Sequence, residues 1–102
     1  MNPLNQLELQ ACLIERQAMR HTPAGIPVVE ACLQHESQQM EAGSVRKVNV
    51  EISAIALGDV AKWLQAAPVG VLVQVKGFLA AKSRNSKMPI LHIQQIEFLE
   101  GK

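Results

Sequence analysis

The segment 71–98 is VLVQVKGFLAAKSRNSKMPILHIQQIEF, in which two apolar runs flank a basic one. Valine occupies every second position from 71 to 75, and this two-residue period is typical of a strand with one buried face. Gly77 permits a kink or bulge before the strand continues. The apolar run Ile90–Phe98 predicts the returning strand, so the whole segment is expected to form a hairpin.

The connection between these two strands is basic. It carries three cations and no acid within residues 82–87: Lys82, Arg84 and Lys87. Residues 60–96 contain five cations and no acid, whereas residues 1–59 contain four cations against seven acids. This asymmetry indicates a face that attracts anions, although charge alone fits an unevenly charged, solvated surface equally well.

Three further strands are predicted before residue 58, because apolar residues alternate along each of them. We expect the first at 4–20, the second at 26–35 and the third from about 45 to 57. A turn rich in Pro and Gly at 21–27 separates the first two strands, and a polar connection at 36–43 separates the next two.

Residues 59–66 change to helical spacing, which places Val60, Trp63 and Leu64 on one apolar stripe. Three strands, a short helix and two strands follow the order of the oligonucleotide-binding (OB) fold, an all-β, five-stranded Greek-key barrel. The helix between the third and fourth strands is what favours this fold over a simple sandwich. The length of 102 residues predicts one domain, residues 1–102. We expect Trp63, Phe78 and Phe98 to fill the core, with a position beside the basic loop as the alternative for Phe78.

Composition argues against several other classes of protein. No apolar run is long enough to span a bilayer, and the first residues lack a signal-peptide pattern. Cys12 and Cys32 are too few for a disulfide framework and are interpreted as thiols in a reducing cytoplasm. No Cys/His spacing predicts a metal site, and no catalytic constellation or cofactor motif is present, so we expect a protein that is not an enzyme.

Several short motifs resemble one known family in the same order along the chain. They are Asn5-Gln6-Leu7-Glu8-Leu9, Thr22-Pro23-Ala24-Gly25-Ile26-Pro27, Leu33-Gln34-His35-Glu36-Ser37 with Glu41-Ala42-Gly43, Val75-Lys76-Gly77-Phe78, Ser86-Lys87-Met88, Leu91-His92 and Gln95-Ile96-Glu97. The family is primosomal replication protein N, PriB. The resemblance implies a bacterial OB-fold homodimer, related to single-stranded DNA-binding protein (SSB), that helps to reload the replicative helicase. It implies action with the PriA helicase and, in some bacteria, with DnaT.

The resemblance also implies where single-stranded DNA should lie. The family's main DNA contact is the basic loop between the fourth and fifth strands, which is the segment 82–87 here. A basic residue at the end of the first strand corresponds to Arg20, and the basic start of the third strand to Arg46 and Lys47. The full set of residues predicted to bind single-stranded DNA is Arg20, Arg46, Lys47, Lys76, Lys82, Arg84 and Lys87.

This chain departs from the family pattern at three places. A family aromatic on the third strand falls near Asn49, an Arg after the family His is Glu36, and the basic loop is about two residues shorter. Single-strand binders usually add aromatic stacking to a cationic groove. With only three aromatic residues, we expect weak, sequence-indifferent and strongly salt-dependent binding. Alternatively, the protein is an adaptor that docks PriA or SSB and hardly binds DNA.

Dimerisation has a separate basis in the first two strands. Cys12, Ile14, Val28 and Cys32 occupy the phase opposite the predicted core. A two-fold pairing of equivalent strands would bury such a patch and bring two basic loops onto one surface. Alternatively, bends or bulges in the strands turn these side chains inward.

Overall fold

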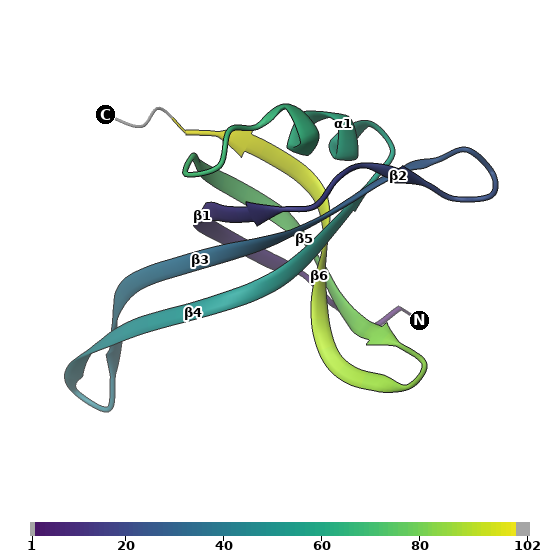
Figure 1. Ribbon diagram of the computed structural model, residues 1–102. Helices are drawn as coiled ribbons and strands as arrows, with labels where there is room; N and C mark the ends of the chain where they lie inside the picture. The colour runs from purple at the N-terminus through teal and green to yellow at the C-terminus, as the bar shows by residue number, and fades with distance from the viewer. Residues whose placement is uncertain (1, 100–102) are drawn as a thin grey trace.

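The computed structural model describes residues 2–99 as one barrel built from six strand segments and a helix (Figure 1). In chain order these are β1 (Leu7–Arg16), β2 (Arg20–His21), β3 (Pro27–Glu41), β4 (Ser44–Leu57), α1 (Asp59–Ala66), β5 (Leu72–Ser83) and β6 (Ser86–Phe98). The predicted first strand is therefore interrupted at residues 17–19. Its second part, β2, pairs with the start of β3.

The sheet closes on itself. Its strand order is β1-β5-β6-β4-β3-β2, and β1 also pairs with β3. All pairings are antiparallel except β4 with β6, where Ala54 lies opposite Leu91. With β1 and β2 counted as one interrupted strand, this is the five-stranded OB barrel, and α1 lies between β4 and β5 as predicted.

The core lies inside the barrel and follows the predicted alternation along most strands. The largest fully buried side chains are Leu13, Leu33, Leu64, Leu91, Val29, Val73 and Val75. Gly77 is also buried, and a Cβ on it would lie 1.8 Å from the backbone oxygen of His92. The pairing of β5 with β6 shifts register at Lys76/Gly77, which confirms the predicted kink or bulge.

Two predictions about aromatic core residues are wrong. Trp63 is 52% exposed and Phe98 is 45% exposed. Of the predicted stripe, Leu64 is buried and Val60 packs partly buried against the core, but Ala61 rather than Trp63 completes the buried face of the helix. An eight-residue helix that closes one end of a barrel buries only a narrow line of side chains, and Trp63 lies to one side of that line.

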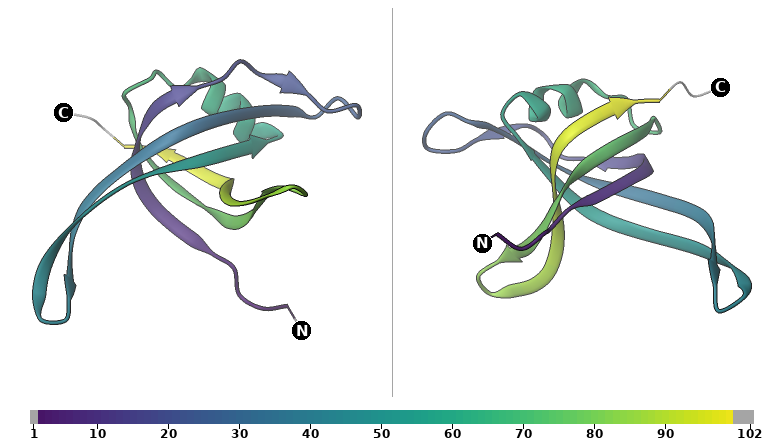
Figure 2. Two further views of the ribbon diagram at one scale, coloured as in Figure 1. Left: turned by 60° about the horizontal axis from the view of Figure 1, so that its bottom comes forward. Right: turned by 180° about the vertical axis from the view of Figure 1, so that it is seen from behind.

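The predicted polar connection at 36–43 is also wrong. β3 and β4 stay paired as far as Glu41 and Ser44, and only Ala42 and Gly43 form the turn. Both turn residues have positive φ, 53° and 82°, as tight hairpin turns of type I′ require. Figures 1 and 2 show this hairpin projecting away from the barrel. Because no layer covers the hairpin there, Val50 is 45% exposed.

Of the four residues predicted to form an outward patch on the first two strands, one faces the core instead. Val28 is only 4% exposed and packs inside, next to the equally buried Val29. The pairing of β1 with β3 shifts register between Leu13 and Glu15, so a bulge in β1 lies at Ile14, whereas β3 pairs with β4 without a shift at Val28 and Val29. Cys12, Ile14 and Cys32 remain half-buried.

Candidate nucleic-acid interface

The basic segment is a strand hairpin rather than a six-residue loop. β5 continues to Ser83 and β6 begins at Ser86, so only Arg84 and Asn85 form the turn. Lys82, Arg84 and Lys87 are all exposed. Within residues 2–99 the ion pairs involve Arg20 and Arg46, and none of these three hairpin cations has a carboxylate partner. Their charges therefore remain available to an anion.

A groove of about 430 Å³ runs beside this hairpin. Each strand segment from β2 through β6 contributes to its lining. The lining residues are Arg20, Glu30, Ile55, Lys82, Ser83, Ser86, Met88, Ile90 and His92. In Figures 1 and 2 the β5–β6 hairpin and the β2–β3 turn lie on the side of the barrel away from the β3–β4 tip. The groove thus brings together two of the predicted cations, Arg20 and Lys82.

Arg20 is not a free cation. Its Nη2 donates to Oε2 of Glu30 at 2.8 Å, and the Arg20 side chain remains 54% exposed. The carboxylate offsets much of the guanidinium charge in the groove, while the exposed part of the guanidinium keeps donors for a second acceptor. Arg20 is therefore the weaker of the two cations for a phosphate.

Phe78 also lies outside the buried core, contrary to prediction. Its ring stacks on that of His92, with centroids 4.8 Å apart and planes 9° from parallel. His92 lies at the base of the hairpin, where it lines the groove.

The other three predicted cations lie elsewhere. Arg46 is on the projecting β3–β4 hairpin and pairs with Glu41 at 3.5 Å. Lys76 lines a separate depression with Glu8 and Glu97 among its neighbours. The structure thus separates these residues from the β5–β6 groove and places an acid beside each.

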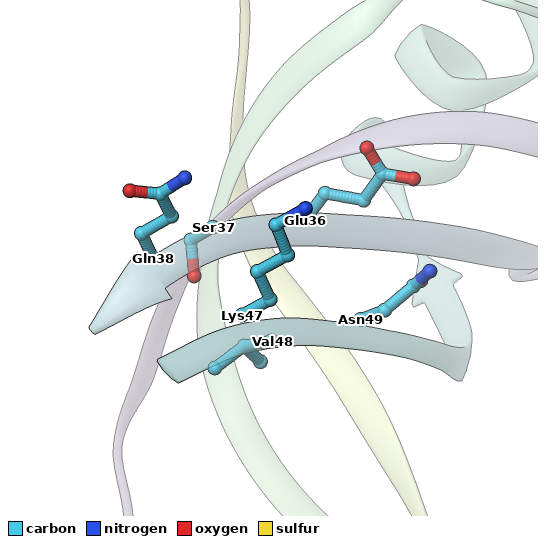
Figure 3. A pocket seen from close by; sticks show the side chains of 6 residues that line it. All are labelled: Glu36, Ser37, Gln38, Lys47, Val48 and Asn49. Carbon is cyan, nitrogen blue, oxygen red and sulfur yellow. The ribbon is translucent and has the colours of Figure 1, made fainter. Parts of the chain in front are cut away.

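Lys47 lines a shallow pocket on β3 and β4, shown in Figure 3. The other residues around it are Glu36, Ser37, Gln38, Val48 and Asn49. Glu36 lies opposite Asn49 in the strand register, and the amide of Gln34 donates to Asn49 Oδ1 at 3.1 Å. The pocket carries one cation, one anion and no aromatic ring, so it offers neither net positive charge nor a stacking surface.

An acidic strip borders the groove on the other side of Lys82. A second groove there is lined by Glu15, Gln17, Glu30, Ala31, Cys32, Ser53 and Lys82. Burial raises the pKa of the Cys32 thiol, and the carboxylates of Glu51 and Glu15 raise it further. The thiol donates to Glu51 Oε1 at 3.9 Å. A polyanion is therefore disfavoured along this strip.

Comparison with known proteins identifies the family. Residues 5–95 match a family model described as "Another single-strand binding protein family". The replication restart protein PriB of Bordetella pertussis is 49% identical over 98 residues, which cover 96% of this chain and 92% of the relative. PriB of Neisseria meningitidis serogroup B is also 49% identical, over 95% of this chain and 97% of the relative. The chain belongs to the PriB family of replication restart proteins.

Solved structures agree with this assignment. PriB from Ralstonia solanacearum superposes with a TM-score of 0.87 at 38% identity, covering 96% of this chain and 100% of that one. The single-stranded DNA binding protein from Thermus aquaticus superposes with a TM-score of 0.78 at 28% identity, over 97% of this chain and 52% of that one. The predicted PriB resemblance and the barrel related to SSB are both confirmed.

The groove beside the β5–β6 hairpin is also lined by residues that were missing from our predicted set. They include Glu30, Ile55, Met88 and His92. Strand alternation places each on an outward phase, yet it does not show which outward residues face the same groove. That requires the pairing of β6 with β4, where His92 lies opposite Ile55.

Residues 2–99 contain no group of three or more His, Cys, Asp or Glu side chains placed to hold a metal ion. No helix among these residues has the length and apolar character needed to cross a bilayer.

Proposed function

We propose that this PriB-family protein binds single-stranded DNA through the β5–β6 hairpin and the groove beside it. The observation that carries the proposal is the presence of three exposed cations on one hairpin, Lys82, Arg84 and Lys87, without carboxylate partners among residues 2–99. Phosphates would contact these side chains first, and Arg20 would add a contact from the opposite wall of the groove.

The strand is expected to cross the hairpin and to avoid the acidic strip lined by Glu15 and Glu30. Arg46, Lys47 and Lys76 are proposed as peripheral contacts, because each lies near an acid and outside the groove. With Trp63 and Phe98 away from the groove lining and Phe78 stacked on His92, phosphate contacts would supply most of the affinity.

The test compares two triple variants that remove the same total charge. The first is Lys82→Ala with Arg84→Ala and Lys87→Ala, and the second is Arg46→Ala with Lys47→Ala and Lys62→Ala. Anisotropy of a labelled oligothymidylate at low salt should show a loss of roughly tenfold or more for the hairpin variant and about threefold or less for the control. Equal losses would show that only net charge matters and would contradict a specific site.

In replication restart, we propose that the protein stimulates PriA while both are bound to DNA, with DnaT as a further partner in some bacteria. The hairpin variant should then lose stimulation of PriA unwinding in parallel with its loss of DNA affinity. Stimulation that survives the loss of DNA binding would favour the second candidate, an adaptor that docks PriA or SSB through protein contacts. The observation that favours an adaptor is Trp63, a tryptophan 52% exposed on α1, because aromatic side chains are frequent anchors at protein interfaces.

A further inference from the structure

His92 lies in a row of side chains that crosses the outer face of the sheet. In the strand registers, Phe78 lies opposite His92, His92 opposite Ile55, and Ile55 opposite Glu30. Glu30 in turn binds Arg20. The row therefore has the Phe78–His92 pair at one end, the Arg20–Glu30 ion pair at the other, and Ile55 between them.

The imidazole ring of His92 is positioned by its neighbours, but its two nitrogens have no hydrogen-bond partner among residues 2–99. Phe78 covers one face of the ring in a parallel stack, and the neighbour in register on the next strand, Ile55, is apolar. Within residues 2–99 neither ring nitrogen of His92 takes part in a hydrogen bond, whereas both nitrogens of His35 do. A positioned imidazole on the groove wall can accept a hydrogen bond when neutral and only donate when protonated.

Few charges face His92, so its own charge would matter. The charged residues that line the groove are Arg20 from β2, Glu30 from β3 and Lys82 from β5, and none comes from β4 or β6. The charges of Arg20 and Glu30 offset each other, which leaves Lys82 as the uncompensated cation. A proton on His92 would double the uncompensated positive charge in the groove.

We infer that His92 is a proton-dependent contact to the DNA backbone, in which the imidazolium donates a hydrogen bond to a phosphate that also contacts Lys82. This rests on the proposed function and adds a residue to it. Carboxylates and ammonium groups with ordinary pKa values keep their charges between pH 6 and 8, whereas an imidazole gains or loses its charge in that range. The raised pKa of Cys32 keeps that nearby thiol neutral in this range. Binding should therefore strengthen as pH falls from 8 to 6.

The experiment measures oligothymidylate affinity by anisotropy at pH 6.0 and 8.0 and constant ionic strength. Wild type should bind about three- to tenfold more tightly at pH 6.0, through one additional charge-assisted hydrogen bond. His92→Gln should lose this gain, because glutamine keeps a polar group but does not titrate. His21→Gln is the matched control, since His21 is an exposed histidine on β2 outside the groove lining, and it should keep the gain.

A second measurement uses the wild-type protein, so it does not depend on how the variant folds. NMR titration of the His92 ring, assigned by comparison with His92→Gln, should show its pKa rising when the oligonucleotide is bound, by linkage with the tighter binding of the protonated form. An unchanged His92 pKa in the complex would overturn the inference, and so would a His92→Gln variant with the full pH dependence. In either case, binding that still depends on the hairpin cations would leave the proposed function intact. If the wild-type protein bound the oligonucleotide at neither pH, both the inference about His92 and the proposed function would be overturned.

Discussion

At the scale of single residues, the chemistry of this protein depends on which charges have partners. Arg20 and Arg46 are paired with carboxylates, whereas Lys82, Arg84 and Lys87 have none among residues 2–99. The seven cations predicted to bind DNA are therefore not equivalent. Sequence reasoning could identify them by type and position, but their partners come from other strands.

Cys32 offers a residue-scale test of the acidic strip. The carboxylates of Glu51 and Glu15 disfavour the thiolate, so they raise the pKa of Cys32, as burial does. In a Cys12→Ser background, the rate of alkylation of Cys32 by iodoacetamide should still be rising with pH above 9.0, its ordinary pKa. Glu51→Gln removes one negative charge, lowers the pKa, and should raise the rate at pH 8 by about two- to fivefold. Glu97→Gln is the control, and a rate that Glu51→Gln leaves unchanged or lowers would contradict the strip.

At the scale of elements, local patterns predicted every strand region and the helix, but not how far the strands extend or which helix face is buried. The β3–β4 hairpin leaves the barrel, so its exposed, polar residues 36–43 lack the alternation that identifies a half-buried strand. In α1, Leu64 is buried and Val60 partly buried as their helical spacing predicts, yet Ala61 is buried where Trp63 was expected. Small residues give a weak hydrophobic signal, although they are what fits against a barrel end.

The orientation of α1 can be tested by two substitutions on adjacent residues. Leu64→Ala should lower the free energy of unfolding by about 2–5 kcal/mol, because Leu64 is completely buried in the core. Trp63→Ala should cost clearly less, about 1 kcal/mol, because more than half of that residue is already in solvent at 52% exposure. Urea denaturation of both variants measures the difference. If Trp63→Ala lowered the free energy of unfolding more than Leu64→Ala does, Trp63 would have to lie in the core, as we first predicted.

At the scale of the whole molecule, the β3–β4 and β5–β6 hairpins extend from the barrel in different directions (Figures 1 and 2), and they differ in charge. The β5–β6 hairpin carries uncompensated cations, whereas the β3–β4 hairpin has Arg46 paired with Glu41 and Lys47 close to Glu36. A net charge of +1 for the chain hides this separation. We expect a homodimer to present two basic hairpins to one DNA strand, as proposed from the family resemblance.

The salt dependence of binding measures how many hairpins are engaged. Each neutralised phosphate changes the slope of log affinity against log salt by about −0.7 for a single strand, so three cations predict about −2 and six about −4. Light scattering should give twice the 11.2 kDa chain mass if the protein is a dimer. A dimer with a slope near −2 would mean that only one hairpin binds at a time, and a monomer would contradict the proposed homodimer.

Strand alternation, the turn residues and the change to helical spacing at 59–66 were enough to determine an OB barrel, because these are local properties of the backbone. The tertiary structure alone decided that Val28 turns inward, that Phe78 stacks on His92 and that Arg20 shares a groove with Lys82. These relations depend on how separate strands are arranged in the closed sheet, including the parallel pairing of β4 with β6. A periodic pattern defines the two faces of its own strand, but only the closed sheet determines what each face meets.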